Sequence, residues 1–133
     1  MSQENVEVVR RTTDAYNGGD LDGLVEHWAP DAVLDWSNSR GLEAGVYRGH
    51  EEIQEFTKRF LAAWNDVRIE IDDPIVVEDD LLVVVNVTYL RGRDGIETQA
   101  RSAWLITFRD GQQTSLTLYQ TKTEALEAAG LSA

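Results

Sequence analysis

The chain has 133 residues, a length that fits one domain spanning residues 1–133, and its lack of cysteine excludes disulfides, thiolate catalysis and thiolate metal sites. Its 24 acidic residues against 12 basic ones give a net charge of −12 at pH 7, which argues against nucleic-acid and membrane-surface partners. The first residues lack the order of a signal peptide and no apolar run approaches the roughly 20 residues of a membrane span, so we expect a soluble cytoplasmic protein.

Two helices are predicted within the first 30 residues. Apolar or small side chains recur at helical spacing in the first helix, at Val6, Val9, Thr13 and Tyr16. The stretch from residue 17 to residue 20, Asn-Gly-Gly-Asp, supplies a helix stop followed by an N-cap. The second helix has an apolar face and is expected to end at Pro30; that face consists of Leu21, Leu24, Val25 and Trp28.

A strand, a loop and the strongest helix of the chain follow. The strand is predicted at residues 32–36, and a loop containing three glycines leads from residue 37 to residue 49. In the third helix five large apolar residues share one stripe: Ile53, Phe56, Phe60, Leu61 and Trp64.

The second half of the chain has the period of strands. Val67, Ile69 and Ile71 alternate with charged residues, and the β-branched run at residues 81–91 predicts a long strand that is covered on both faces. Asp-Gly pairs at residues 94–95 and 110–111 are hairpin signals, so three long antiparallel strands should follow one another as a meander. The chain then ends in a short helix, because Thr121 and Glu124 have the spacing of a capping box and Gly130 can stop the helix.

This order of elements predicts an α+β fold. A curved, mostly antiparallel sheet would wrap around the long third helix and form a cone-shaped α+β barrel with an apolar pocket at its mouth. On the outer face of the sheet, four apolar residues of the long strand should be removed from solvent: Val83, Val85, Val87 and Tyr89. We therefore expect a homodimer formed through the outer sheet face.

Four segments together resemble a known family: AYNGGDLDGLVEHWAPDAVLDW, YRGHEEIQEF, WLITFRDGQ and EALEAAGL. Over nearly its whole length the chain is similar to the SnoaL-like proteins of the nuclear transport factor 2-like superfamily. That superfamily includes ketosteroid isomerase, limonene epoxide hydrolase, scytalone dehydratase, polyketide cyclases and catalytically inert binding domains. The resemblance therefore implies the fold and leaves the reaction open.

The positions that the resemblance assigns to catalysis hold other residues in this chain. Matching to ketosteroid isomerase places its general-base aspartate at Trp36, its oxyanion-hole tyrosine at Thr12 and its second oxyanion-hole acid near Trp104. Matching to the epoxide hydrolases places an arginine and two aspartates at Asn86, Thr88 and Leu118. Neither catalytic set is present, so neither reaction is expected. Asn86 and Thr88 share a strand face, and the resemblance turns that face toward the pocket.

Few titratable residues are candidates for acid–base chemistry. In a strand, an inward Trp36 turns Asp35 outward, unless a bulge reverses the assignment. His27 lies at the edge of the second helix's apolar face, where it would be either a structural histidine or a well-tuned base. Tyr16 and Tyr47 are placed to offer a hydroxyl group.

No metal site and no cofactor are predicted. The two histidines lie on different elements without ligand spacing, and His50 at the start of the third helix is read as a capping or solvent-exposed residue. The chain has no nucleotide-binding glycine motif and no phosphate loop.

Two functional hypotheses follow. In the first, the protein is a binding domain whose pocket holds a small hydrophobic or aromatic molecule; its predicted ligand-binding residues are Thr12, Tyr16, Trp36, Tyr47, Trp64, Asn86, Thr88, Trp104 and Leu118. In the second, it is a lyase, isomerase or hydrolase acting on a hydrophobic metabolite. His27 or Asp35 would then be the base and Tyr16 or Tyr47 the proton donor. A pocket wall without an ionisable side chain would remove the second hypothesis, because acid–base catalysis would lack its participants.

Overall fold

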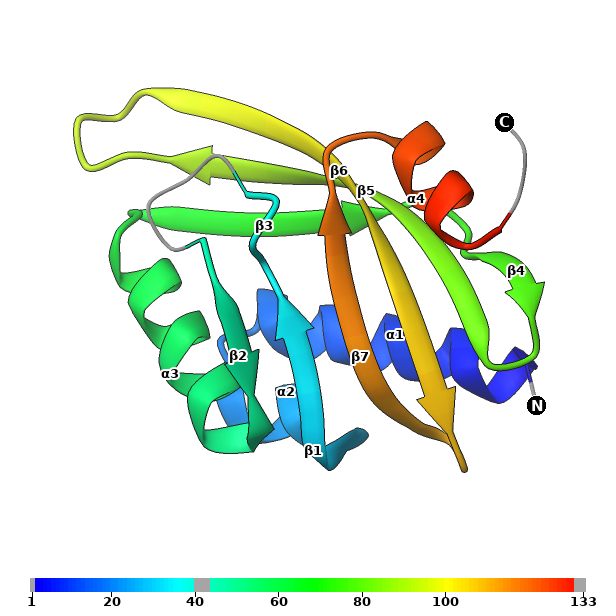
Figure 1. Cartoon of the computed structure of the whole chain (residues 1–133). Helices are drawn as coiled ribbons and strands as arrows, with labels where there is room; N and C mark the ends of the chain where they lie inside the picture. The colour runs from blue at the N-terminus through cyan, green and yellow to red at the C-terminus, as the bar shows by residue number, and fades with distance from the viewer. Residues whose placement is uncertain (1, 40–43, 131–133) are drawn as a thin grey trace.

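The computed structural model describes residues 2–39 and 44–130, and it confirms the α+β fold class (Figure 1). Its helices are α1 (Ser2–Asn17), α2 (Leu21–Val25), α3 (Gly49–Ala62) and α4 (Lys122–Ala128). Its strands are β1 (Trp28–Asp35), β2 (Val46–Arg48), β3 (Asp66–Ile71), β4 (Ile75–Glu78), β5 (Leu81–Arg91), β6 (Glu97–Arg109) and β7 (Gln112–Tyr119). None of the helices in these two ranges is long and apolar enough to cross a membrane.

The strands form one curved sheet in the order β2-β1-β7-β6-β5-β3. All pairs are antiparallel except β1 with β7, which is parallel. β3 pairs with the second half of β5, and β4 pairs with the first residues of β5. The meander of β5, β6 and β7 turns where expected, at Gly95 and Gly111, whose positive φ angles of 84° and 79° suit glycine.

The helix caps form as the sequence indicates. Asp20 accepts a hydrogen bond from the backbone N–H of Gly23 at 2.9 Å and begins α2. Thr121 and Glu124 make both hydrogen bonds of a capping box at the start of α4. These local signals act over three residues, which is why the sequence alone locates them.

The second helix is shorter than its apolar pattern predicts. α2 ends at Val25, and Trp28 begins β1 instead of completing the apolar face of the helix. The backbone N–H of Gln113 donates to the carbonyl of His27 at 2.8 Å, so β7 draws this segment into the sheet. Pro30 lies inside β1, where the pairing with β7 is interrupted by an irregularity between Trp28 and Val33.

The two faces of the sheet have separate cores. On the face covered by α1, α2 and α3, the buried cluster includes Leu82 and Val84 of β5. On the opposite face Val83 and Ala103 pack against Ala125 of α4 and are fully buried. The helix α4 therefore covers part of the outer face that the sequence assigns to a partner subunit.

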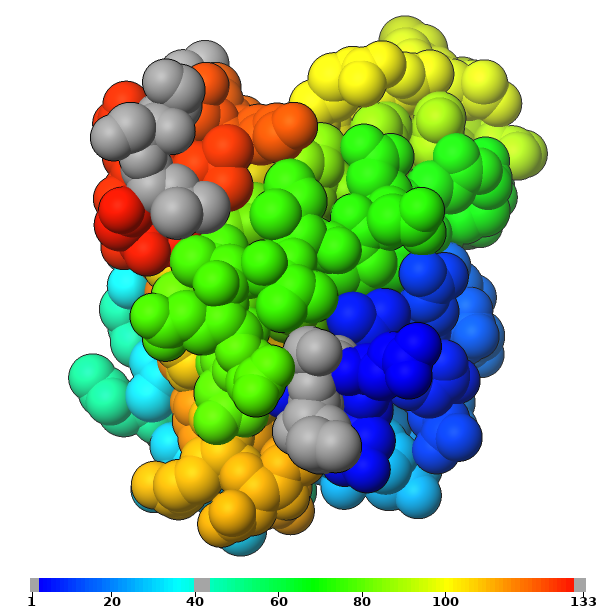
Figure 2. Space-filling view, turned by 90° about the vertical axis from the view of Figure 1, so that its right-hand side faces the viewer, coloured from blue at the N-terminus to red at the C-terminus, as the bar shows by residue number. Residues whose placement is uncertain are grey.

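Beyond α4 the outer face is less covered. Figure 2 shows α4 (red) and part of the β5–β6 hairpin (yellow) projecting on either side of a notch in the surface, above the green segment that includes β4. Residues 97–101, near the hairpin end of β6, are all exposed. Val87 and Tyr89 of β5 are half-buried.

Candidate functional site

A cavity of about 80 Å³ lies between the helices α1, α2 and α3 and the inner face of the sheet. Its aliphatic wall consists of Val9, Leu24, Leu34, Ile53, Ile69, Ile106 and Leu116. Its aromatic wall consists of Tyr16, Trp28, Trp36, Phe56, Phe60 and Trp104. The cavity thus lies where the sequence predicts an apolar pocket.

The aromatic residues of α3 connect the cavity wall to the residues behind it. The ring of Phe56 lies 5.6 Å from that of Trp36 and 4.4 Å from that of Tyr47, centroid to centroid. Phe60, one turn further along α3, lies 6.1 Å from Phe56. These separations are those of favourable aromatic pairs. Tyr47 therefore supports the wall from behind and does not line the cavity itself.

Two of the cavity's threonines are satisfied by their own helices. The hydroxyl of Thr13 donates to the carbonyl of Val9 at 2.9 Å, and that of Thr57 donates to the carbonyl of Ile53 at 2.8 Å. Both bonds span one helical turn, a common arrangement for threonine within a helix.

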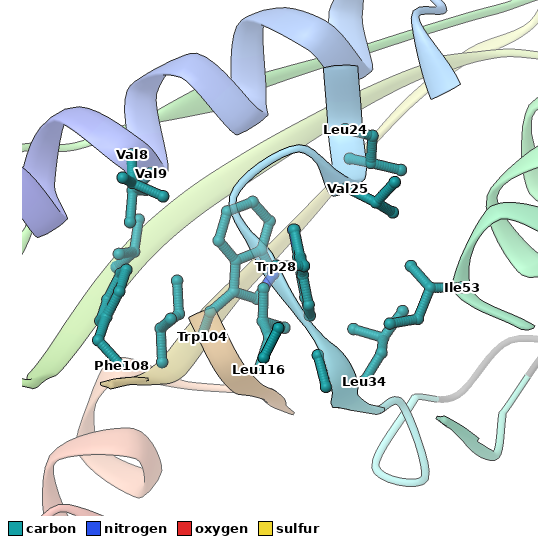
Figure 3. Close-up of a cluster of buried hydrophobic side chains, with 14 of the residues drawn as sticks. Val8, Val9, Leu24, Val25, Trp28, Leu34, Ile53, Trp104, Phe108 and Leu116 are labelled. Atoms are coloured by element: carbon teal, nitrogen blue, oxygen red, sulfur yellow. The ribbon is translucent and has the colours of Figure 1, made fainter. Parts of the chain in front are cut away.

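Other polar groups in the wall have no partner among the described residues. They are the indole N–H groups of Trp28 and Trp104, the side-chain nitrogen of Gln113 and the hydroxyl of Thr12. Trp28, Trp104 and Gln113 are only 3%, 7% and 1% exposed. Figure 3 shows Trp28 and Trp104 within the same cluster of buried side chains as Leu34 and Leu116.

Tyr16 is the only ionisable residue among the described residues that line the cavity. Burial raises the pKa of its hydroxyl well above the ordinary value, because the phenolate would lose its hydration. At neutral pH this group is therefore protonated, and it can donate a hydrogen bond but cannot act as a base.

Asp35 lies outside the cavity wall. Its carboxylate accepts hydrogen bonds from the backbone N–H of Ser37 at 3.0 Å and from the Ser37 hydroxyl at 2.6 Å. Its neighbours Leu34 and Trp36 both line the cavity, as the alternation of a strand requires. The carboxylate thus caps the turn that follows β1.

The two histidines also lie outside the cavity wall. His27 is half-buried between α2 and β1, and its carbonyl accepts the backbone bond from Gln113. The Nε2 atom of His50 lies 2.8 Å from the carbonyl oxygen of Trp28, which ties the start of α3 to β1. Within residues 2–39 and 44–130, no group of three or more histidine, cysteine, aspartate or glutamate side chains is placed to hold a metal ion.

The predicted ligand-binding residues divide into two groups. Those that line the cavity are Thr12, Tyr16, Trp36, Thr88 and Trp104, and those that do not are Tyr47, Trp64, Asn86 and Leu118. Asn86 is buried and its side-chain oxygen accepts from the Ser102 hydroxyl at 2.9 Å. Leu118 packs in the core, and Trp64 lies near the β5–β6 turn.

Sequence reasoning missed Trp28 and Gln113 as wall residues. Trp28 was expected on a helix face, and its place in β1 follows from the pairing with β7. Gln113 points inward because the register of β6 and β7 shifts between Thr107 and Phe108, which leaves Thr114 as an extra residue. Strict alternation back from Leu116 would have turned Gln113 outward. The only signal in the sequence is an amide that follows a hairpin turn, which does not distinguish a wall residue from a surface one.

Comparisons with known proteins agree with this architecture. Residues 9–116 match the model of the SnoaL-like domain. No curated protein sequence matches the chain.

Solved structures extend the likeness to the whole fold. A protein named TerC, co-crystallised with polyporic acid, superposes with a TM-score of 0.79 at 19% identity, over 93% of this chain and 96% of that one. A Mycobacterium tuberculosis protein in complex with estradiol-17beta-hemisuccinate gives 0.77 at 14% identity, over 90% and 95%. The Delta 5-3-ketosteroid isomerase from Mycobacterium sp. gives 0.74 at 16% identity, over 92% and 95%. At these identities the likeness concerns the fold.

Proposed function

The chain belongs to the SnoaL-like domain family, and we propose that it is a binding domain that holds a small apolar or aromatic molecule in the cavity beneath α1, α2 and α3. The composition of the cavity wall carries this proposal. Tyr16 is the only ionisable group among the described lining residues, and its raised pKa keeps it protonated. The rest of the wall is apolar except for a few hydrogen-bonding side chains. Ligand pockets usually have this composition.

The wall argues against the alternative of an acid–base enzyme. A general base must reach the substrate's proton directly or through one water molecule. Asp35 is bonded to Ser37 outside the wall, and His27 is likewise not a lining residue. The structural relatives include an isomerase, but this chain has Trp36 where the family resemblance places the isomerase's base.

The volume of the cavity limits the size of the ligand. About 80 Å³ is roughly half of the 150 Å³ of an engineered apolar cavity that binds benzene. A monocyclic molecule would therefore need modest movements of the wall, in which half-buried lining residues such as Trp36 and Phe60 would take part. Larger ligands, such as the steroid conjugate bound by the mycobacterial relative, would need a wider opening.

We also propose that two copies associate through the part of the outer sheet face that α4 leaves uncovered. Its apolar residues Val87 and Tyr89 are half-buried in the single chain, next to Val85 at the edge of the α4 cluster. A second copy would remove them from water. Sedimentation at micromolar concentration should show a dimer, and a monomer alone would refute this part of the proposal.

A matched pair of variants tests the binding function. Val9 lines the cavity, whereas Val8, its neighbour on α1, is buried in the same core outside the cavity wall. Val9→Phe should fill the cavity, while Val8→Phe imposes a similar packing strain elsewhere. Calorimetric titration with toluene and acetophenone should show binding to the wild type and to Val8→Phe but not to Val9→Phe. Absence of binding to the wild type, or binding that survives Val9→Phe, would overturn the proposal.

A further inference from the structure

Most of the unpaired buried polar atoms belong to residues that line the cavity. Five buried side-chain nitrogen or oxygen atoms lack a hydrogen-bond partner among the described residues, and four of them belong to residues that line this cavity. The fifth is the side-chain oxygen of Asn5, whose nitrogen is bonded to the carbonyl of Asp79 at 2.8 Å. Folded proteins pair nearly all such groups, because a buried donor without an acceptor lowers stability. The four atoms at the cavity belong to one wall, and although each exposes less than 1 Å² of surface, a ligand that displaces the wall slightly can supply the missing partner.

The chemistry of these groups defines that partner. An indole N–H only donates, so Trp28 and Trp104 both require an acceptor. The amide nitrogen of Gln113 also donates, and the Thr12 hydroxyl can do either. Tyr16 adds a protonated hydroxyl to the same wall.

The absence of charged side chains among the described lining residues limits the class of ligand further. No aspartate, glutamate, histidine, lysine or arginine is among the described lining residues. A cationic ligand would lose its hydration without meeting a carboxylate, and an anionic one without meeting a cation. An uncharged ligand avoids both penalties.

Two of the donor residues are neighbours in the sheet. Trp28 and Gln113 are paired residues of the parallel strands β1 and β7, so their backbones are adjacent. Trp104 reaches into the same cluster from β6 (Figure 3). Trp28, Trp104 and Gln113 belong to strands of the sheet, whereas Phe56 and Phe60 belong to α3.

Resting on the proposed function, we infer that the ligand is an uncharged molecule of about one ring, whose carbonyl-type oxygen accepts hydrogen bonds from Trp28, Trp104 and Gln113. The apolar part of the molecule packs against the α3 side. A hydrocarbon of the same shape fits the space but leaves the donors unpaired.

Acetophenone and α-methylstyrene provide a matched pair of probes, because a CH₂ group replaces the oxygen with little change in shape. Titration into ¹⁵N-labelled protein would follow the indole N–H resonances, assigned through Trp→Phe variants. Acetophenone should move the Trp28 and Trp104 N–H protons downfield, as hydrogen bonding to an acceptor does, and α-methylstyrene should not. Trp64, outside the wall, serves as the control and should not move with either probe.

Affinity ratios give a second readout that does not depend on the spectrum. The ratio of acetophenone affinity to α-methylstyrene affinity should fall about tenfold in Trp104→Phe and in Gln113→Met, the latter nearly the same shape as the wild type. Gln113→Met keeps the test decisive if Trp104→Phe fails to fold. If both probes bind with a ratio that neither variant changes, the inference is wrong and the binding function stands. If neither probe binds, the proposed function itself fails.

Discussion

The two faces of the sheet are packed in different ways. Under α4 the small side chains of Val83, Ala103 and Ala125 meet without exposure to solvent. Under α1, α2 and α3, large aromatic side chains surround a cavity, and several buried donors have no partner among the described residues. Tight packing and satisfied polar groups favour stability, whereas spare volume and unpaired donors reduce it. Both faces contribute buried core, and the spare volume of the inner face supports the proposal that a ligand binds there.

The largest expected effect comes from a charge beneath α4. Val83→Asp would bury an unpaired carboxylate in the tightly packed face and should lower the free energy of unfolding by about 3 kcal/mol or more. Val76→Asp, on β4 where the side chain is 46% exposed, should cost much less. Urea denaturation of the two variants measures the difference. Equal losses would show that α4 does not seal this face.

Next in size is the loss of a paired polar group from the inner face. Asn86 accepts a hydrogen bond from Ser102, so Asn86→Leu leaves that hydroxyl without its acceptor. The free energy of unfolding should fall by about 1–3 kcal/mol in denaturant titrations. A neutral or stabilising result would mean that the pair contributes nothing to the fold.

The buried hydroxyl of Tyr16 should have a smaller effect on the free energy of unfolding, and this effect should depend on pH. Because burial raises the pKa of its hydroxyl, the folded protein holds this proton more tightly than the unfolded chain does. Its contribution to stability is therefore complete below pH 10 and declines as the pH rises above it, by about 1.4 kcal/mol per pH unit. Denaturation of the wild type and Tyr16→Phe between pH 8 and pH 11 should show the steeper decline in the wild type. If the stability of the two proteins changed with pH in parallel, the raised pKa of Tyr16 would be contradicted.

The smallest effect is expected for Gln113→Met, which should not destabilise the protein as Asn86→Leu does. Gln113 is as buried as Asn86, but its side-chain nitrogen has no partner among the described residues. Gln113→Met removes that nitrogen at nearly constant shape, so the stability should stay the same or rise by up to about 1 kcal/mol. Thermal unfolding without ligand gives the measurement. A loss as large as that of Asn86→Leu would show that Gln113 is an ordinary structural residue.

The sequence predicts the parts of the fold that depend on neighbouring residues. The helical stripe from Ile53 to Phe60, the turns at Gly95 and Gly111 and the capping box at Thr121 all form as expected. Each depends on periodicity or on contacts within a few residues. This is also why the superfamily resemblance, which rests on the same segments, agrees with the fold.

The wall of the cavity is less predictable because it depends on pairing between distant segments. Trp36 and Thr88 were expected to face the pocket, and they line it, because both continue a regular alternation. Trp28 joins the wall only because β7 pairs with β1, 85 positions away at Gln113. Gln113 itself turns inward through an irregularity at Thr114 that no local pattern announces. Two of the three donors that define the proposed ligand, Trp28 and Gln113, are therefore residues that the sequence could not reveal.

A crystal structure of the protein soaked with acetophenone would test the central claim most directly. The account predicts density for the probe inside the cavity, with its oxygen within about 3.2 Å of the indole nitrogen of Trp28 or Trp104 or of the Gln113 amide. Density only outside the cavity, or a bound probe whose oxygen points away from all three donors, would contradict it.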